Sequence, residues 1–286
     1  MSPSLPLRHQ LEPADVEAFA PDAKVGLLAT VTPQGTPHVT LITTLSGCAP
    51  DTMLWGQFCE GASKQHVLTE PRVGFLVMTL ERQVWTGRAR WLDATVQGPD
   101  LDAFNQRPMF RYNAYFGIHT SHRMKLESVR GPEPLAIPSM AVGAISASVV
   151  GPAVSKRRVP SALRPWAVSL LRGLQTLKFL CWIDGDGYPR LIPAVGAAPA
   201  GSSRVVVSAM GHRGDLLGLE PGRPVALFAL NLQMESVLLR GRLGAFRGPY
   251  GLELAPLDIE QVYNSMPPKQ GLVWPQQPLE PVRSFD

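Results

Sequence analysis

The chain has 286 residues and a net charge of +4, a length that suits one large domain or two of about 140 residues each. Apolar residues make up 45% and charged residues 17%, which excludes an intrinsically disordered chain. The 26 glycines and 28 prolines disfavour a helical bundle, because proline removes a helix donor and glycine costs backbone entropy. A β-rich protein with many turns is expected.

Charge and cysteine content set the expected partners and compartment. The densest basic cluster is only Lys156-Arg157-Arg158, whereas nucleic-acid-binding proteins concentrate such residues along a stripe, so no nucleic-acid partner is predicted. Three widely spaced cysteines predict no disulfide framework and a cytoplasmic location. There is no secretory signal pattern. The longest uncharged stretch, 134–155, contains prolines and glycines, so no membrane span is predicted.

The first half of the chain predicts strands joined by tight turns. In chain order we expect a short helix over 13–20, strands over 24–31 and 38–43 around a turn at 32–35, strands over 52–58 and 73–80, and a pair over 83–86 and 88–92 interrupted by Gly87 as at a bulge. A short helix over 62–68 ends at Glu70-Pro71. A helical insertion is predicted from about 100 to 126, and a closing strand from 137 to 150.

The same order of elements recurs in the second half. We expect a helix over 161–177 with Ser161 as its N-cap, a hairpin over 179–192, and strands over 204–209, 224–230 and 237–246. Three pairs of landmarks recur at nearly constant offsets in the sequence, namely Gly35-x-Pro37 with Gly187-x-Pro189, Glu70-Pro71 with Glu220-Pro221, and Gly87-Arg88 with Gly241-Arg242. These predict an internal duplication, with a first domain over 1–155 that includes the insertion and a second, more divergent domain over 156–286.

One short segment, Gly61-Ala62-Ser63-Lys64, has the chemistry of an anion site. It lies between a predicted strand ending near Phe58 and a predicted helix. A hydroxyl, a lysine and free backbone N–H groups at a helix start suit a phosphate monoester. Taken alone, the same residues suit a helix N-cap at Ser63 and a solvated Lys64 equally well. The sequence has none of the common nucleotide-loop, dinucleotide, serine-hydrolase or zinc-protease motifs.

The spacing His119-x-x-His122 would place two metal ligands on one face of a helix. No third ligand stands nearby in the sequence, and Arg123 and Lys125 would repel a cation. No metal site is predicted, and the two histidines are expected on an exposed helix face.

Several segments together resemble the pyridoxamine 5′-phosphate oxidase-like family of FMN-binding split barrels. The hairpin over 28–38 is similar to the family's opening strands. Ser63-Lys64 followed by Glu70-Pro71-Arg72 resembles its Ser-Arg-Lys…Asn-Pro-Arg segment, and Glu81-Arg82-Gln83-Val84…Gly87-Arg88-Ala89 resembles its Glu-Arg-Gln-Val…Gly-Lys-Ala strand. The resemblance covers about residues 23–92, and the second half repeats its outline. It implies a mainly β chain with helical insertions, folded as two tandem split β-barrel domains of Greek-key type.

The resemblance implies FMN as the cofactor and assigns residues to it. In the family, the strand here predicted over 38–43 lies along the isoalloxazine, residues at Gln57 and Phe58 flank the flavin, Ser63 and Lys64 hold the phosphate, and Gln83 hydrogen-bonds the ring. The implied cofactor-binding set is His38, Val39, Thr40, Leu41, Thr43, Gln57, Phe58, Ser63, Lys64 and Gln83. Family flavin sites lie between two barrels of a homodimer, so the resemblance implies a homodimer or an intrachain pseudo-dimer.

The sequence also departs from the family's oxidase. His38 and Thr43 stand where the oxidase has arginine and lysine, and its C-terminal Arg and His signature is missing from 274–283. The resemblance therefore implies an FMN-dependent oxidoreductase that acts on an unidentified small molecule other than pyridoxamine phosphate. The candidate substrate contacts are Arg111, Tyr112, Asn113 and Tyr115, although an insertion packed on the barrel would use the same aromatic residues. No catalytic acid or base is identified.

Two alternative functions remain open at this point. One is a flavin- or haem-binding protein that senses or stores its ligand without turnover. The other is a deazaflavin-using reductase, which Ser63-Lys64 and Gln83 disfavour because they resemble the FMN branch. In the second half, Arg213-Gly214 stands in place of Ser63-Lys64, so about one FMN per chain is expected.

Overall fold

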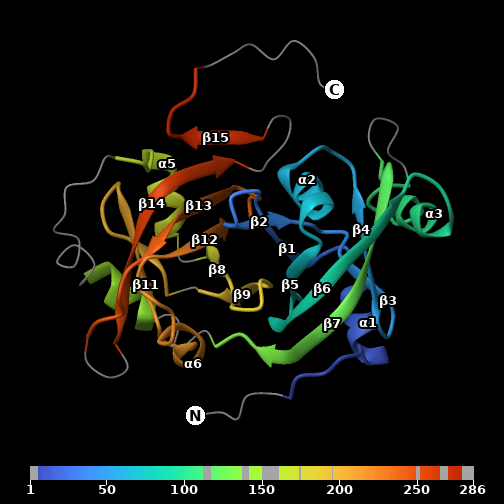
Figure 1. Cartoon of the computed structure of the whole chain (residues 1–286), viewed down its shortest axis with the longest axis horizontal. Helices are drawn as coiled ribbons and strands as arrows, with labels where there is room; N and C mark the ends of the chain where they lie inside the picture. The colour runs from blue at the N-terminus through green and yellow to red at the C-terminus, as the bar shows by residue number, and fades with distance from the viewer. Residues whose placement is uncertain are drawn as a thin grey trace. The chain divides into compact units, whose positions relative to one another are not determined.

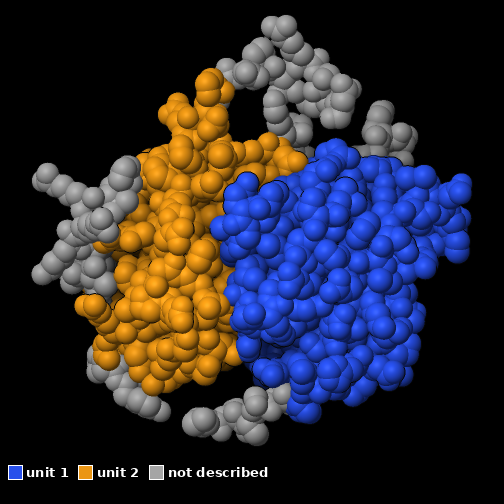
Figure 2. Space-filling model, in the orientation of Figure 1, with its two compact units in different colours: residues 1–135, 183–191 blue, residues 136–182, 192–286 orange. Residues whose placement is uncertain are grey.

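The computed structural model describes every residue except 1–5, 112–116, 137–141, 150–160, 174, 195, 249–251, 265–269 and 279–286. The chain divides into two compact units. Unit 1 comprises residues 1–135 and 183–191, and unit 2 comprises residues 136–182 and 192–286 (Figure 2). No helix among the described residues is long and apolar enough to cross a membrane.

The first sheet has seven antiparallel strands in the order β2-β1-β5-β6-β7-β4-β3 (Figure 1). Strand β1 is buried almost throughout because its sequence is a continuous apolar run. Its core includes Trp55, Val67 of α2 and Phe75. The elements of this half are α1 (Pro13–Phe19), β1 (Val25–Val31), β2 (Pro37–Leu41), β3 (Ser46–Ala49), β4 (Thr52–Gln57), α2 (Ala62–Thr69), β5 (Arg72–Met78), β6 (Gln83–Thr95), α3 (Pro99–Asn105) and β7 (Thr120–Pro134).

The second sheet has eight strands, in the order β10-β11-β14-β13-β12-β8-β9 with β15 paired to β14. Its core includes Leu180, Trp182 and Leu227. The elements of this half are α5 (Pro165–Arg172), β8 (Leu177–Ile183), β9 (Pro189–Pro193), β10 (Ala198–Pro199), β11 (Arg204–Ser208), α6 (Arg213–Leu216), β12 (Arg223–Leu230), β13 (Ser236–Leu243), β14 (Leu254–Asn264) and β15 (Gly271–Trp274).

The two sheets share one strand order. Written from the other edge, the second sheet reads β9-β8-β12-β13-β14-β11-β10, which matches the first sheet strand for strand in chain order. Gly35 and Gly187 both adopt a positive φ, 71° and 83°, in the turn of the first hairpin of each sheet. A Cβ at Gly87 would overlap a backbone oxygen of β7, and one at Gly241 would overlap a backbone oxygen of β14. The predicted fold class, mainly β with two tandem domains, is confirmed.

The predicted helical insertion over 100–126 is wrong beyond its first turns. Among the described residues of this range only those of α3 are helical, and Thr120–Pro134 forms the long strand β7. From His122 to Leu126 buried and exposed side chains alternate, which is the period of a strand and not of a helix. The two short strands predicted around Gly87 are one strand, β6, with a register shift at Arg88/Ala89.

Other elements of the structure also differ from the predicted ones. The predicted strand over 137–150 is wrong for residues 142–149, which are helical, and the remainder lies outside the described residues. Helix α5 begins after Arg164 and not at Ser161, because Pro165 suits the first turn of a helix. Strands β3, β10, β14 and β15 were not predicted.

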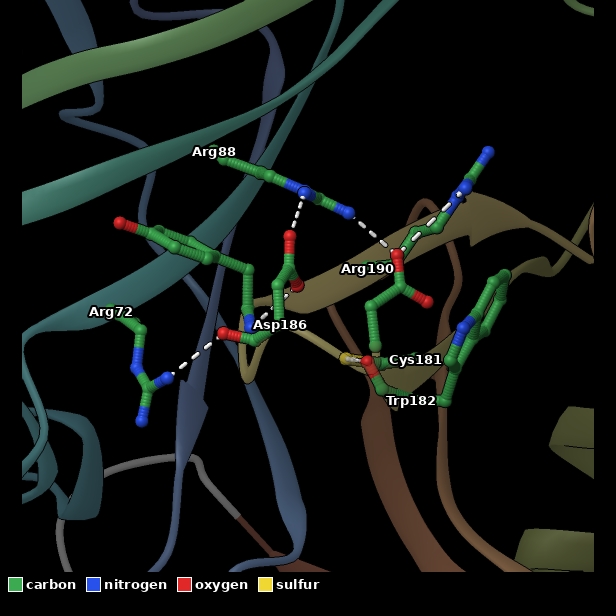
Figure 3. Close-up of polar contacts among 8 residues, drawn as sticks. Arg72, Arg88, Cys181, Trp182, Asp186 and Arg190 are labelled. Atoms are coloured by element: carbon green, nitrogen blue, oxygen red, sulfur yellow. Dashed lines mark hydrogen bonds and ion pairs between the residues drawn. The ribbon is translucent and has the colours of Figure 1, made fainter.

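Residues 183–191 are held in unit 1 by arginines of β5 and β6 (Figure 3). Arg88 donates to the carboxylate of Asp184 at 2.6 Å and also pairs with Asp186. Arg72 donates to the backbone oxygen of Asp186 at 2.9 Å. The Arg88 guanidinium also lies over the Tyr188 ring, 5.6 Å from its centroid. Arg88 therefore pairs with both carboxylates of this turn, and Arg72 binds its backbone.

Candidate functional site

The start of α2 is the candidate anion site of unit 1. Strand β4 ends at Gln57, and Gly61 takes the N-cap position with extended backbone and no side-chain cap. The backbone N–H of Lys64 donates to the Gly61 oxygen at 3.2 Å. Ser63 is fully buried and Lys64 is 8% exposed. The alternative of Ser63 as N-cap beside a solvated lysine is therefore wrong.

Lys64 is a largely buried residue. Burial lowers the pKa of Lys64, while the nearby Cys59 and Glu60 act to raise it. A Cβ at Gly61 would lie 2.9 Å from Lys64 Nζ, so the bare glycine gives this ammonium room beside the helix start. Within the part of the chain that the structure describes, no carboxylate oxygen lies within 4.0 Å of Nζ.

A chain of hydrogen bonds runs from Ser63 into the sheet. Ser63 Oγ hydrogen-bonds Thr40 Oγ1, and Thr40 Oγ1 lies 3.1 Å from His38 Nε2. His38 and Thr40 are two residues apart on β2 and share a face of the sheet. Thr30, opposite His38 in the register, bonds His66 Nδ1 of α2 at 3.0 Å. These bonds fix the first turns of α2 on β1 and β2.

A second network lies at the end of β4. Gln57 Nε2 donates to Glu60 at 3.1 Å, and Gln57 Oε1 lies 2.8 Å from His122 Nε2. Trp91 Nε1 donates to His122 Nδ1 at 3.2 Å. Since Nδ1 accepts, the ring proton of a neutral His122 is on Nε2.

The surroundings of His122 keep it neutral. Burial, Lys64 and His119 lower its pKa to about 4. Trp55 stacks on the His122 ring with centroids 3.6 Å apart and an interplanar angle of 3°. At neutral pH the neighbour of Lys64 is therefore an uncharged imidazole that does not compete for an anion. The expectation of exposed helix histidines is wrong for His122, which is buried on β7.

The structure brings some of the predicted cofactor residues together and separates others. His38, Thr40 and Ser63 are in one hydrogen-bonded chain, whereas Val39 and Leu41 face the opposite side of β2. Phe58 follows Gln57 and is exposed. Thr43 lies beyond the end of β2.

Gln83 lies on a different strand from this group. It begins β6, three strands from β2 in the sheet order, whereas α2 packs on β1 and β2. Arg111 is exposed, and Tyr112, Asn113 and Tyr115 lie outside the described residues.

Sequence reasoning missed Thr30, Trp55, His66 and Trp91. His66 stands three residues after Ser63, a helical spacing that places both on one face and could have indicated it. Thr30, Trp55 and Trp91 contact the site only through strand register and packing across the sheet. Neither leaves a pattern in the local sequence.

The corresponding helix of the second half has different chemistry. The spacing from the end of β11 to the start of α6 equals the spacing from the end of β4 to the start of α2. Gly214 and Asp215 therefore occupy the positions of Ser63 and Lys64. This shifts the predicted correspondence to Arg213-Gly214 by one residue. Arg213 forms an ion pair with Glu253. The second half therefore has an acidic residue where the first has its buried lysine.

No family model matches the sequence, and no curated protein matches it. Solved structures similar to this chain include an FMN-binding protein from Syntrophomonas wolfei subsp. wolfei (12% identity, TM-score 0.37, covering 42% of this chain and 85% of that one). Another is a putative pyridoxamine 5′-phosphate oxidase from Lactobacillus delbrueckii (14%, 0.35, 43% and 96%). A third is an FAD-binding protein from Mesorhizobium loti (17%, 0.28, 43% and 96%). Each aligns with less than half of this chain.

Proposed function

We propose that unit 1 binds FMN and holds its phosphate at the start of α2. The observation that carries the proposal is Lys64, a residue that is 8% exposed and whose ammonium has no carboxylate within ion-pair distance among the described residues. A buried charge is stable only when it is paired, and a phosphate dianion would pair it. The Ser63 hydroxyl would supply a further donor, and the positive end of the α2 dipole would favour an anion. This is the phosphate position that the sequence resemblance implies.

FMN is favoured over FAD by the size of this anchor. One hydroxyl and one ammonium at a single helix start suit a phosphate monoester. A dinucleotide would need a Gly-rich pyrophosphate turn, and the sequence has no such motif.

We further propose that the protein is an oxidoreductase acting on a small molecule. Bound flavin would supply the redox chemistry, and the chain's own groups would orient the flavin and tune its ring. The departures at His38 and Thr43 support a substrate other than pyridoxamine phosphate. In this proposal the neutral His122 and Gln57 form a rigid, uncharged wall beside Lys64.

The first experiment is the identity of the bound ligand. The purified full chain is expected to show flavin absorbance and to release FMN on acid treatment, identified by chromatography. Release of FAD, a Soret band, or no affinity for added FMN would each refute the proposal. Turnover of bound flavin with NAD(P)H and an acceptor would then separate an oxidoreductase from a protein that only binds flavin.

We also infer that the second half is a divergent copy without this anchor. The shared strand order supports the duplication, and Asp215 at the Lys64 position together with the Arg213–Glu253 pair argues against a second phosphate. The expected stoichiometry is about one FMN per chain. Two tightly bound flavins per chain would refute it.

A further inference from the structure

Glu60 is an acidic residue that lies close to Lys64 without pairing with it. Lys64 Nζ lies beside Gly61, the residue that follows Glu60, because a Cβ at Gly61 would be 2.9 Å from Nζ. Burial lowers the pKa of Lys64 and the charge of Glu60 acts in the opposite direction, so the two groups are within electrostatic range. No ion pair within 4.0 Å joins these two described residues. Instead, Glu60 Oε1 accepts a hydrogen bond from Gln57 Nε2 at 3.1 Å.

The direction of the hydrogen bonds behind Glu60 is fixed at both ends. The indole Nε1 of Trp91 can only donate, and it donates to His122 Nδ1 at 3.2 Å. The neutral His122 must therefore donate from Nε2, which lies 2.8 Å from Gln57 Oε1. The Gln57 amide then has only its Nε2 left to face Glu60, and a carboxylate can only accept. Gln57 is thus held in the one orientation that binds Glu60.

Burial keeps these donors and acceptors in place. Gln57 is 6% exposed and His122 is 4% exposed, and the His122 ring is stacked on Trp55. Water therefore has little access to replace a partner of the Gln57 amide. A hydrogen bond to an ionised carboxylate is stronger than one between neutral groups, whereas ion pairs made by exposed side chains are weak. Glu60 is exposed, so the Gln57 amide can retain it in preference to Lys64.

We propose that Gln57 is a positioning residue for phosphate recognition, which keeps Glu60 away from Lys64 and so leaves the ammonium to a phosphate. The inference rests on the proposed function of the α2 site. Without the Gln57 amide, Glu60 is free to turn towards Lys64. A carboxylate in that place occupies the ammonium and repels a phosphate dianion, so FMN would have to displace it.

The test compares FMN with riboflavin, which lacks the phosphate, in titrations of the full-length apoprotein. Gln57→Leu removes the amide and keeps a side chain of similar size. Because the released Glu60 carboxylate competes for Lys64, we expect FMN affinity to fall about three- to tenfold, with riboflavin affinity unchanged. Glu60→Gln keeps an acceptor for the Gln57 amide and removes the charge, so it should bind FMN at least as tightly as wild type.

A double-mutant cycle separates this role from a general loss of packing. In a Glu60→Gln background, Gln57→Leu should cause no loss of FMN affinity, because the competing carboxylate is gone. A loss that persists in that background, or an equal loss for FMN and riboflavin, would overturn the role of Gln57. Melting temperatures without ligand identify a variant that fails to fold. Trp91→Phe then decides, since it removes the donor that fixes His122 and should lower FMN affinity about two- to threefold only while Glu60 is present.

Failure of the proposed function would have a different signature. Wild-type protein that binds FMN no more tightly than riboflavin would refute the phosphate site itself, and this role of Gln57 with it. Wild-type protein that prefers FMN, together with a Gln57→Leu variant that keeps the full preference, would overturn only the role of Gln57.

Discussion

Lys64→Met is the sharpest test of the phosphate site. Methionine keeps an unbranched side chain of similar length and removes the charge. If the ammonium pairs with a phosphate, the lost charge-assisted bond is worth about 1.5–3 kcal/mol, or about 10- to 100-fold in the dissociation constant of FMN. Riboflavin affinity should stay the same. Fluorescence titration of apoprotein with both flavins measures the difference.

In the absence of flavin, the same variant is expected to keep or raise the stability of the protein. Burial lowers the pKa of Lys64 below its ordinary value of 10.5, so wild-type stability rises as pH increases from the folded-state pKa towards 10.5. Lys64→Met removes that rise. Its melting temperature at pH 7 should equal or exceed that of wild type, because an uncompensated buried charge has been removed.

Lys125→Met is the matched control, since it makes the same chemical change at an exposed position of β7. It should alter neither FMN affinity nor stability beyond about 0.5 kcal/mol. Equal FMN affinity in wild type and Lys64→Met would refute the reasoning. So would a Lys64→Met apoprotein that melts well below wild type, because the ammonium would then be stabilising the fold.

Three further predictions concern stability. Because burial lowers the pKa of His122 to about 4, wild type should lose stability as pH falls from 6.5 to 4, and His122→Phe should lack this loss in thermal melts. Burial lowers the pKa of Lys178, only 4% exposed, to about 8. Lys178→Met should therefore gain up to about 3 kcal/mol at pH 7 in urea unfolding, a gain that shrinks between pH 8 and 10.5; an unchanged or lower midpoint contradicts it. Arg88→Ala breaks two part-exposed ion pairs and should cost about 1 kcal/mol or less, decreasing with added salt, so a salt-independent loss would be inconsistent with it.

The strands and turns that the sequence predicts well have local causes. The turn at Gly35 needs a positive φ that glycine accepts, and alternating or continuous apolar runs flank it. Strand β7 was not predicted because its first buried residues, Ser121 and His122, are polar and do not form an apolar pattern in the sequence. The burial of His122 depends on Gln57 and Trp91, which come from other strands.

The candidate site was predictable only in part for the same reason. Ser63 and Lys64 are adjacent in sequence and share a helix start, so their chemistry could be predicted locally. The roles of Thr40 and His38 depend on how α2 lies on the sheet. The position of Gln83 on β6, three strands from β2, depends on the strand order of the sheet. No short sequence motif encodes that order.

The two halves show that residues needed for the sheet and residues needed for the site are separable. Gly87 and Gly241 occupy the same tight approach between neighbouring strands, where any Cβ would meet a backbone oxygen, so a change at either would disturb the sheet itself. The start of the helix has no such constraint, and there Lys64 is replaced by Asp215. Landmarks of the sheet can therefore match between the halves while the charge at the helix start is reversed. For this reason, a candidate site residue such as Lys64 should be matched between the two halves by its place in the helix and its charge, and not by sequence offset alone.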